Sequence, residues 1–468
     1  WVVLPVVWVA LEYARAHALS GFPWFFLAHS QYRRVLLIQV CDLVGQYGVS
    51  VFVAMVNGVL IDALGLWLFR RACGAARPVR HVVAGAAVSA LACAFLVVYG
   101  YARVGQKATR PGPTVGVVQQ AFPISLFRKG APPEEVFAKH RDNSLPLRGA
   151  GCDLVVWPES MLGYGGMDPE QILAIDPLAI DVRTGRRRWT AREQQMIRRC
   201  QADVRALQVL LADLGCPLLA GGPMTDPATG LPTNSALLFD RGPTGRIRLV
   251  GRYDKMHLVP FGESVPFRTT WPGLHRLLRR FVPEAMPQLA AGRKPVVFEI
   301  TAGGEGDGDQ RFGVVVPICY EGVFSRVCRR LIMHNGRKRA DLLVNISNDG
   351  WFVLATARWN HASTELDQHL AQYVFRAVEL RVPVVRAVNT GISAYIDSNG
   401  RIVGTVRGYR GRRKMIGGRL VAHTLVDERV SLYSLIGDRV GDVFAWVLSA
   451  GAAVIAMFLL GKRRKSKE

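Results

Sequence analysis

The chain is long, basic and rich in hydrophobic residues. It has 468 residues, of which 50% are hydrophobic, and a formal net charge of +23. This length predicts two or three structural units. A mean hydropathy of +0.17 in so basic a chain is unusual for a soluble protein and indicates that apolar and charged segments are kept apart, as in membrane proteins. We attribute the charge to membrane orientation signals and solvated surface, and we expect no nucleic-acid partner.

Four apolar segments are expected to cross a membrane. The uncharged runs 43–61, 82–102 and 443–461 approach the roughly 20 apolar residues that a helix needs to span a bilayer, and the first of them extends to residue 69. Residues 1–11, WVVLPVVWVAL, look like the end of a fourth span. Residue 1 is Trp, so we expect further spans before it. The alternative for each run is a buried core helix.

Two basic segments predict the orientation. The link 70–81 carries four arginines, and the tail 462–468 reads KRRKSKE. Both should lie in the cytoplasm, because loops rich in Lys and Arg stay on that side. The region between the last two spans then lies outside the cytoplasm. We therefore divide the chain into membrane helices (1–105), an outer domain (113–425) and a terminal span with its basic tail (441–468).

The outer region alternates short β-rich runs with longer helical stretches. Residues 192–214 and 358–381 have the length and spacing of helices, and DSNGRIVG at 397–404 carries an Asn-Gly hairpin signal. Residues 162–190 have no clear period and are interpreted as a long loop of the kind that often forms a lid. The pattern predicts a layered α/β domain. Several runs are continuously apolar, as in strands covered on both faces, and the predicted strands are 114–120, 152–159, 216–222, 234–240, 295–300, 311–320, 340–349 and 382–389.

The cysteines do not form a metal-binding pattern. Five lie in the outer region, with no CxxC pair and no Cys/His spacing typical of zinc, so we expect no metal and no cofactor. An odd number in an oxidising compartment leaves at least one thiol unpaired or paired between molecules.

α/β domains place their chemistry at the ends of buried strands, and three stretches with polar residues stand out, the second of them rich in aromatic residues and prolines. VVWPES delivers Glu159, GRYDKMHLVPFGE delivers Lys255 and VVVPICYE delivers Cys319. Each residue alone has an ordinary alternative: a helix-capping or solvated Glu, a surface Lys, a buried core Cys.

Together the three residues form a set that can transfer an acyl group. A thiol has an ordinary pKa near 8.5, so few molecules are thiolate at neutral pH. A carboxylate whose pKa is raised by burial can take the proton as the thiol attacks. An ammonium group can stabilise the thiolate and then the oxyanion of the tetrahedral intermediate. This chemistry needs no histidine.

The motifs WPES, YDKMHLVPFGE, PICYE and NISNDGWF, in this order, resemble the carbon–nitrogen hydrolase (nitrilase) superfamily. Within it, GFPW (21–24), QYGVS (46–50) and the terminal span resemble the apolipoprotein N-acyltransferase family, so the resemblance covers nearly the whole chain. It implies a nitrilase-like α-β-β-α sandwich inserted between transmembrane helices of a bacterial cytoplasmic (inner) membrane protein. The family usually has about eight transmembrane spans, and four are expected here. This difference fits our expectation that further spans precede residue 1.

The resemblance also implies roles for individual residues. Glu159 matches the general base, Lys255 the oxyanion-stabilising lysine and Cys319 the nucleophile. Glu263 matches a second acidic residue of the pocket, whose alternative role is a structural hydrogen bond that holds Lys255.

Four residues around NISNDGWF and the nucleophile complete this set. Tyr320 and Glu321 match essential residues that follow the nucleophile, and the alternative for Glu321 is a structural hydrogen bond. Trp351 and Phe352 are expected at the lip of the pocket, in contact with acyl chains, or else they only pack the domain.

The implied reaction moves an acyl chain from a phospholipid to a protein. The expected donor is phosphatidylethanolamine, the intermediate is a thioester on Cys319, and the acceptor is the α-amino group of a diacylglyceryl-cysteine at an apolipoprotein N-terminus. One alternative is a membrane-tethered nitrilase-type amidase acting on a small amide, and another is a catalytically silent membrane scaffold. Apolar residues along the route from the bilayer to Cys319 would favour the acyltransferase over the amidase.

Overall fold

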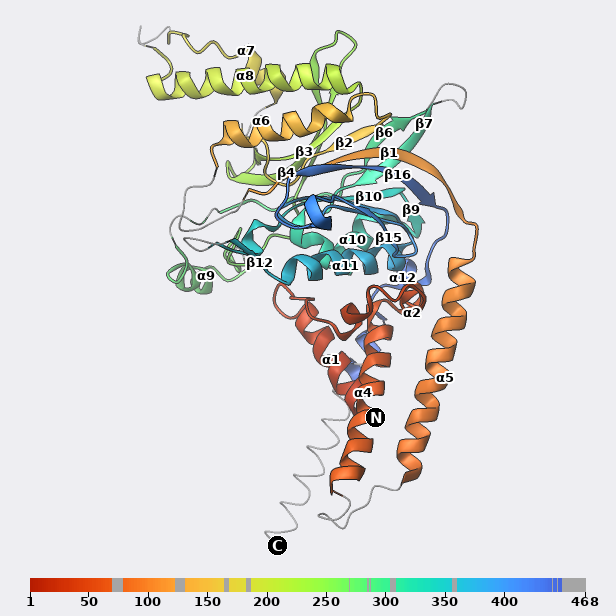
Figure 1. The fold of residues 1–468 in the computed structure, drawn as a ribbon. Helices are drawn as coiled ribbons and strands as arrows, with labels where there is room; N and C mark the ends of the chain where they lie inside the picture. The colour runs from red at the N-terminus through yellow and green to blue at the C-terminus, as the bar shows by residue number, and fades with distance from the viewer. Residues whose placement is uncertain are drawn as a thin grey trace.

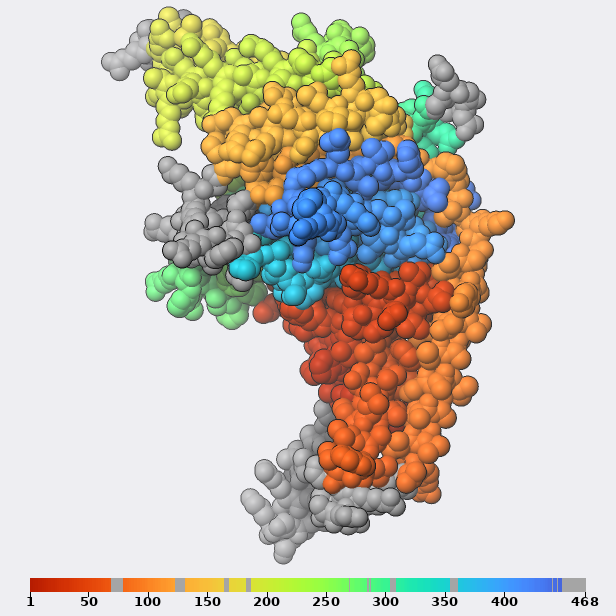
Figure 2. Space-filling view, in the orientation of Figure 1, coloured from red at the N-terminus to blue at the C-terminus, as the bar shows by residue number. Residues whose placement is uncertain are grey.

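The computed structural model contains a layered domain on a narrower column of helices (Figures 1 and 2). It describes residues 1–69, 79–122, 131–163, 168–181, 187–268, 270–283, 286, 288–303, 309–355, 360–439, 441–443 and 445–447.

Three helices form most of the column: α1 (Val3–His17), α4 (Gln46–Phe69) and α5 (Val79–Val104). By length and composition, α4 and α5 are apolar enough to cross a membrane. Only 33% and 11% of their most apolar stretches are buried, whereas a core helix would be mostly buried. This exposure disfavours the core-helix alternative for both.

The segments that would fix the orientation lie largely outside the described residues. Of the predicted terminal span 443–461, only 443 and 445–447 are described, and the basic link is described only from residue 79. The sidedness of the outer domain therefore stays a prediction.

Short helices join α1 to α4 and run across the top of the column: η1 (Leu27–Gln31), α2 (Val35–Ile38) and α3 (Cys41–Val44). They lie directly beneath the layered domain in Figure 1. Residues 27–44 therefore lie between the apolar helices and the layered domain.

The layered domain consists of two six-stranded sheets. The first has the strand order β16 (Gly418–Asp427), β1 (Thr109–Gln119), β2 (Leu154–Val156), β3 (Leu218–Thr225), β4 (Pro232–Arg241) and β5 (Ile247–Asp254). The second has the order β15 (Ile402–Thr405), β14 (Ala394–Ile396), β13 (Val384–Asn389), β10 (Leu342–Asn348), β7 (Gln310–Val315) and β6 (Phe298–Ala302).

Helices cover the outer face of each sheet, which completes the expected α-β-β-α order (Figure 1). The helices α6 (Pro133–Ser144) and α8 (Ala191–Leu214) cover the first sheet. The helices α10 (Ser325–Ile332) and α11 (Glu365–Leu380) lie between the second sheet and the helical column. The α/β fold class predicted from the sequence is thereby confirmed.

Burial explains why the central strands could be recognised. Every position of β10 and β13 is buried, and the two strands pair in parallel from Leu343 opposite Val384 to Asn348 opposite Asn389. Strands covered on both faces read as continuous apolar runs.

All eight predicted strands and both predicted helices are present, with shifted ends. The predicted hairpin joins β14 to β15 through a turn at Gly400, whose φ is +80°. Sequence reasoning missed β5 and β16.

The interpretation of residues 162–190 as a lid is wrong for residues 168–181. These residues include the short helix α7 (Pro169–Ala174), which packs on α8. The Gln201 side chain of α8 donates hydrogen bonds to the carbonyls of Ile172 and Ile175 at 3.1 and 2.8 Å.

A buried ion cluster ties the domain to the column. Asp42 of α3 is fully buried and accepts hydrogen bonds from the Arg381 guanidinium at 2.5 and 3.1 Å and from Arg103 of α5 at 2.6 Å. Arg381 is the residue that directly follows α11, so one carboxylate joins α3, α5 and the helical layer of the domain.

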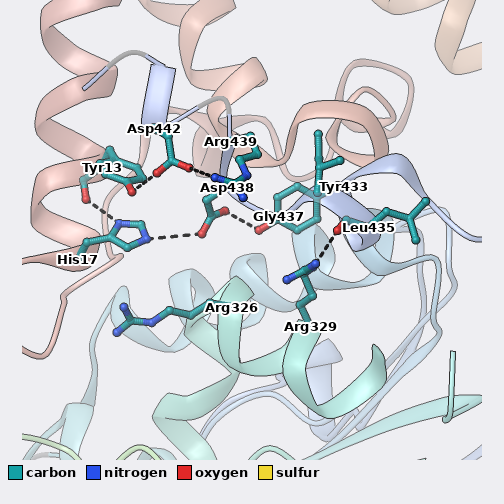
Figure 3. A pocket seen from close by; sticks show the side chains of 11 residues that line it. Tyr13, His17, Arg326, Arg329, Tyr433, Leu435, Gly437, Asp438, Arg439 and Asp442 are labelled. Carbon is teal, nitrogen blue, oxygen red and sulfur yellow. Dashed lines mark hydrogen bonds and ion pairs between the residues drawn. The ribbon is translucent and has the colours of Figure 1, made fainter. Parts of the chain in front are cut away.

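A second polar junction surrounds the hollow in Figure 3, between α1, α10 and the chain after α12 (Leu432–Ile436). His17 lies 3.6 Å from Asp438, which also accepts a hydrogen bond from the Tyr433 hydroxyl at 2.6 Å. Arg329 donates to the carbonyls of Ser434 and Leu435, both at 2.6 Å. These contacts join α1, α10 and the chain around α12, so we interpret the hollow as a structural joint.

Candidate active site

A cavity of about 770 Å³ lies where the carboxyl ends of β2 and β7 meet the segment 20–24. All the predicted catalytic residues except Glu321 contribute to its wall. The lining residues are Ser20, Gly21, Phe22, Trp24, Glu159, Ser160, Pro223, Thr233, Asn234, Lys255, Val259, Pro260, Gly262, Glu263, Leu289, Cys319, Tyr320, Asn348, Trp351, Phe352, Glu365 and His369.

Glu159 follows β2 and is held from both carboxylate oxygens. Its Oε2 accepts the backbone N–H of Asn348 at 2.8 Å, and its Oε1 accepts the Asn234 side-chain amide at 2.6 Å. The turn that carries it packs directly on Gly221 of β3, where a Cβ would lie 2.5 Å from the Cα of Glu159. A glycine at this position therefore lets the turn that carries Glu159 approach β3 closely.

Lys255 follows β5 and is almost completely enclosed. Its Nζ lies 2.9 Å from Glu263 Oε1 and 3.4 Å from Glu159 Oε1. Burial alone would lower the pKa of Lys255, but the two carboxylates raise it above its ordinary value. Burial would likewise raise the pKa of Glu263, but Lys255 holds it below its usual range. The cluster therefore retains an ammonium between two carboxylates.

Cys319 begins the short helix η3 (Cys319–Val323) and has a φ of +51°, a conformation uncommon for a side chain other than glycine. The Tyr373 hydroxyl donates to the Cys319 carbonyl at 2.9 Å. A Cβ at Gly322 would lie 1.9 Å from that hydroxyl, so glycine is required there. Left-handed residues held by surrounding contacts are typical of active sites.

The surroundings of Cys319 keep its thiol protonated. Burial raises the pKa of Cys319, the Glu159 carboxylate raises it further, and Lys255 partly opposes them. A protonated thiol needs a base at the moment of attack, and Glu159 is the carboxylate that acts on it most strongly. Cys319 forms no disulfide, and neither do the other described cysteines.

Tyr320 and Glu321 occupy different environments. Tyr320 lines the cavity and its hydroxyl donates to the Gly21 carbonyl at 3.3 Å. Glu321 is fully buried behind the cavity and accepts the backbone N–H groups of Met256 and Ile318 at 2.7 and 2.8 Å. Burial raises the pKa of Glu321 to about 7, although hydrogen bonds from the backbone N–H groups of Ile318 and His257 oppose the shift. Its contacts favour the structural alternative, since they tie the chain after Lys255 to the chain before Cys319.

An aromatic wall connects the cavity to the helical column. Trp24 lies 5.8 Å from Phe352 and 6.3 Å from Tyr320, measured between ring centroids. Trp351 and Phe352 line the cavity, as predicted for its lip. The wall begins at residues 21–24, in the segment between α1 and η1, so the cavity is apolar on the side of this N-terminal segment.

Sequence reasoning missed three residues of the site. Asn234 donates to both Glu159 and Glu263, at 2.6 and 2.9 Å, and no local pattern marks it. His369 lines the cavity from the second turn of α11. Trp24 belongs to the GFPW motif, which carried a family resemblance without an assigned role.

Comparison with known proteins assigns the family. The carbon-nitrogen hydrolase model matches residues 114–410, and the apolipoprotein N-acyltransferase N-terminal domain model matches residues 1–59. An apolipoprotein N-acyltransferase of Geobacter metallireducens is 33% identical over 99% of this chain and 74% of its own length. This chain belongs to the apolipoprotein N-acyltransferase family. A second member, from Rhodopirellula baltica, is 27% identical over 99% of this chain and 78% of its own.

An amidase from Nesterenkonia sp. is similar in structure, with 16% identity over 73% of this chain and 99% of its own, and a TM-score of 0.39. This similarity is too distant to bear on activity. The N-acyltransferase family assignment rests on the family models and on the relatives.

Proposed function

We propose that the protein transfers an acyl chain from a membrane phospholipid, through a thioester on Cys319, to the α-amino group of the N-terminal diacylglyceryl-cysteine of an apolipoprotein. The observation that carries this proposal is a Glu, Lys and Cys set in one cavity with an apolar wall, in a chain of the N-acyltransferase family. Glu159 is the general base, Lys255 the oxyanion donor and Cys319 the nucleophile.

In the first half-reaction, the Cys319 sulfur attacks the carbonyl carbon of a phospholipid ester while Glu159 takes the thiol proton. Lys255 stabilises the oxyanion of the tetrahedral intermediate. The ester C–O bond breaks, Glu159 returns the proton to the leaving oxygen, and a lysophospholipid departs.

In the second half-reaction, the acceptor amine attacks the thioester carbonyl. Glu159 takes the N–H proton that is released as the C–N bond forms, and gives it to the departing Cys319 thiolate. The product is an N-acylated lipoprotein, and Glu159 and Cys319 regain their starting protonation states.

The membrane arrangement belongs to the same proposal. The apolar helices hold the domain at the surface of the bacterial inner membrane, with the cavity on the extracytoplasmic side and phosphatidylethanolamine as the donor. Diacyl lipids hardly leave a bilayer, since each buried CH₂ group contributes about 0.8 kcal/mol. Trp24, Trp351 and Phe352 then contact the acyl chain and disfavour water as a competing acceptor.

Neither alternative from the sequence is favoured. A tethered amidase shares the triad, but it needs neither the apolar wall nor the N-terminal domain of the N-acyltransferase family. A silent scaffold would not need Glu159, Lys255 and Cys319 to converge on one cavity.

Complementation tests this function. The full natural chain is expressed in a strain depleted of its own N-acyltransferase, and lipoprotein N-termini are read by mass spectrometry. We expect N-acylated termini with the native chain and with Cys200→Ser, which alters a partly buried thiol of α8, but none with Cys319→Ser. Unacylated termini with the native chain, or acylation by Cys319→Ser, would refute the proposal.

A further inference from the structure

A histidine–aspartate pair lines the cavity beside the proposed triad. His369 of α11 is 1% exposed, and its Nδ1 lies 3.0 Å from Asp349 Oδ1. Asp349 is itself fully buried, accepts the Ser347 hydroxyl at 2.6 Å and lies 3.5 Å from the Arg386 guanidinium. The proposed triad chemistry uses neither His369 nor Asp349.

The pair fixes which ring nitrogen carries the proton. A carboxylate accepts a hydrogen bond, so the Nδ1 of a neutral His369 ring must carry the hydrogen that Asp349 receives. The Nε2 then presents a lone pair. Within the described residues, Nε2 is buried and has no hydrogen-bond partner. This is the state of an oriented base.

The surroundings of the ring are mainly aromatic. Ring centroids of Trp24, Tyr373 and Phe352 lie 5.5, 5.5 and 6.4 Å from that of His369. The charged or titratable groups that face it are Asp349, with Arg386 behind it, Tyr373 on its own helix, and Glu365 one turn earlier. Glu365 also lines the cavity and is itself partly exposed to solvent.

The proposed second half-reaction leaves one proton without an acceptor. An α-amino group has an ordinary pKa of about 7.7–8.0, so at neutral pH most acceptor molecules arrive as ammonium. An ammonium has no lone pair and must lose a proton before it attacks. Glu159 takes the proton released during the attack and passes it to the Cys319 thiolate, so it cannot also remove this extra one.

We propose that His369, oriented by Asp349, accepts this extra proton from the α-ammonium group of the acceptor before the amine attacks the Cys319 thioester. The inference rests on the proposed function. The N–H bond of the ammonium breaks, its electron pair stays on nitrogen, and the proton moves to Nε2. The imidazolium then releases the proton to bulk water.

The test separates the two half-reactions. Purified enzyme is loaded with phosphatidylethanolamine, the Cys319 thioester is quantified by mass spectrometry, and a diacylglyceryl-cysteine peptide is then added across a pH series. His369→Asn is the informative variant, because an Asn amide can replace Nδ1 as the donor to Asp349 but cannot act as a base. Gln372→Met, another buried polar residue of α11 that does not line the cavity, is the matched control.

We expect His369→Asn to form the thioester within about twofold of the native rate. Its amide formation should be about tenfold slower at pH 7, where only about a tenth of the acceptor is neutral amine, and should approach the native rate at pH 9. Gln372→Met should keep the native profile.

Several results would overturn the inference. One is a loss of amide formation in His369→Asn that is equal at every pH, since that indicates a structural role. Another is a rate of amide formation in His369→Asn that equals the native rate at every pH. Loss of thioester formation in both His369→Asn and His369→Gln would also contradict it, because the assigned role lies in the second half-reaction. If the native enzyme forms no thioester, the proposed function fails and the inference fails with it.

Discussion

At the scale of single residues, the site depends on a charge that its surroundings both bury and neutralise. Lys255 is 1% exposed and sits between two carboxylates, of which Glu263 is the closer. Removing one partner of a buried ion pair is costly because the other charge is left uncompensated. Lys255 therefore contributes to the stability of the site and, in the proposed mechanism, to the oxyanion.

A Lys255→Met variant tests that dual role. Loss of one oxyanion donor typically lowers the rate about 100- to 1,000-fold, and we expect this decrease in the rate of Cys319 thioester formation. The variant should also unfold at a lower temperature, because Glu159 and Glu263 lose their counter-ion. Lys139→Met, which removes an exposed lysine paired with Glu135 on α6, should change neither quantity. A thioester rate within tenfold of native would exclude Lys255 as the oxyanion donor.

The pKa of Cys319 gives a pH-dependent prediction. Because burial and Glu159 raise it, the thiolate fraction should keep increasing with pH beyond the ordinary range near 8.5. Alkylation by iodoacetamide, followed by mass spectrometry of the Cys319 peptide, should therefore accelerate up to pH 9.5 without a plateau. A plateau below pH 8 would indicate a resting thiolate and would remove the need for Glu159 as a base in the first step.

At the scale of elements, close approach between strand ends sets the geometry of the triad. Gly221 on β3 makes room for the turn that holds Glu159. We expect Gly221→Ala to displace that turn and to slow thioester formation more than tenfold. Gly273→Ala in α9 (Pro272–Arg279) is the matched control, because a Cβ there meets nothing within 4 Å. Equal rates in both variants would show that the Glu159 turn tolerates displacement.

The sequence predicted those elements whose residues carry their own signal. Continuous apolar runs such as β10 and β13 were recognisable because both faces are covered. The polar residues at the ends of such runs gave two of the cavity residues, Glu159 and Cys319, whereas Lys255 was picked out from a stretch rich in aromatic residues and prolines. Strand β5 was missed because it alternates Arg, Gly and Asp with apolar residues and is only partly buried.

The remainder of the site depends on contacts that no local pattern encodes. Asn234 bridges Glu159 and Glu263, which lie 75 and 29 residues away along the chain. The cavity wall places Trp24 beside Gln368 of α11, a separation of 344 residues. Such pairings are set by tertiary packing, so only the structure could reveal them.

At the scale of the whole molecule, the position of the cavity depends on how the domain is fixed to the helices. Asp42 is the central acceptor of that joint, with Arg381 and Arg103 as its partners. Asp42→Asn leaves two guanidinium groups without their counter-ion. We expect a loss of about 3–5 kcal/mol in the free energy of unfolding, measured by denaturant titration in detergent.

A matched control variant sharpens this prediction. Asp142→Asn removes a carboxylate whose ion pair with Arg141 is exposed, and it should cost less than about 1 kcal/mol. If Asp42→Asn is as mild as Asp142→Asn, the domain is held to the column mainly by apolar contacts, and the ion cluster is of minor importance.

The covalent intermediate is the most direct test of the account. Enzyme purified from membranes is incubated with phosphatidylethanolamine, quenched in acid and digested. The mass of the peptide that contains Cys319 is then measured by mass spectrometry. The account predicts a fatty-acyl mass on Cys319 that disappears when a diacylglyceryl-cysteine peptide is added. Absence of the adduct, or an acyl group on another residue while Cys319 stays free, would contradict it.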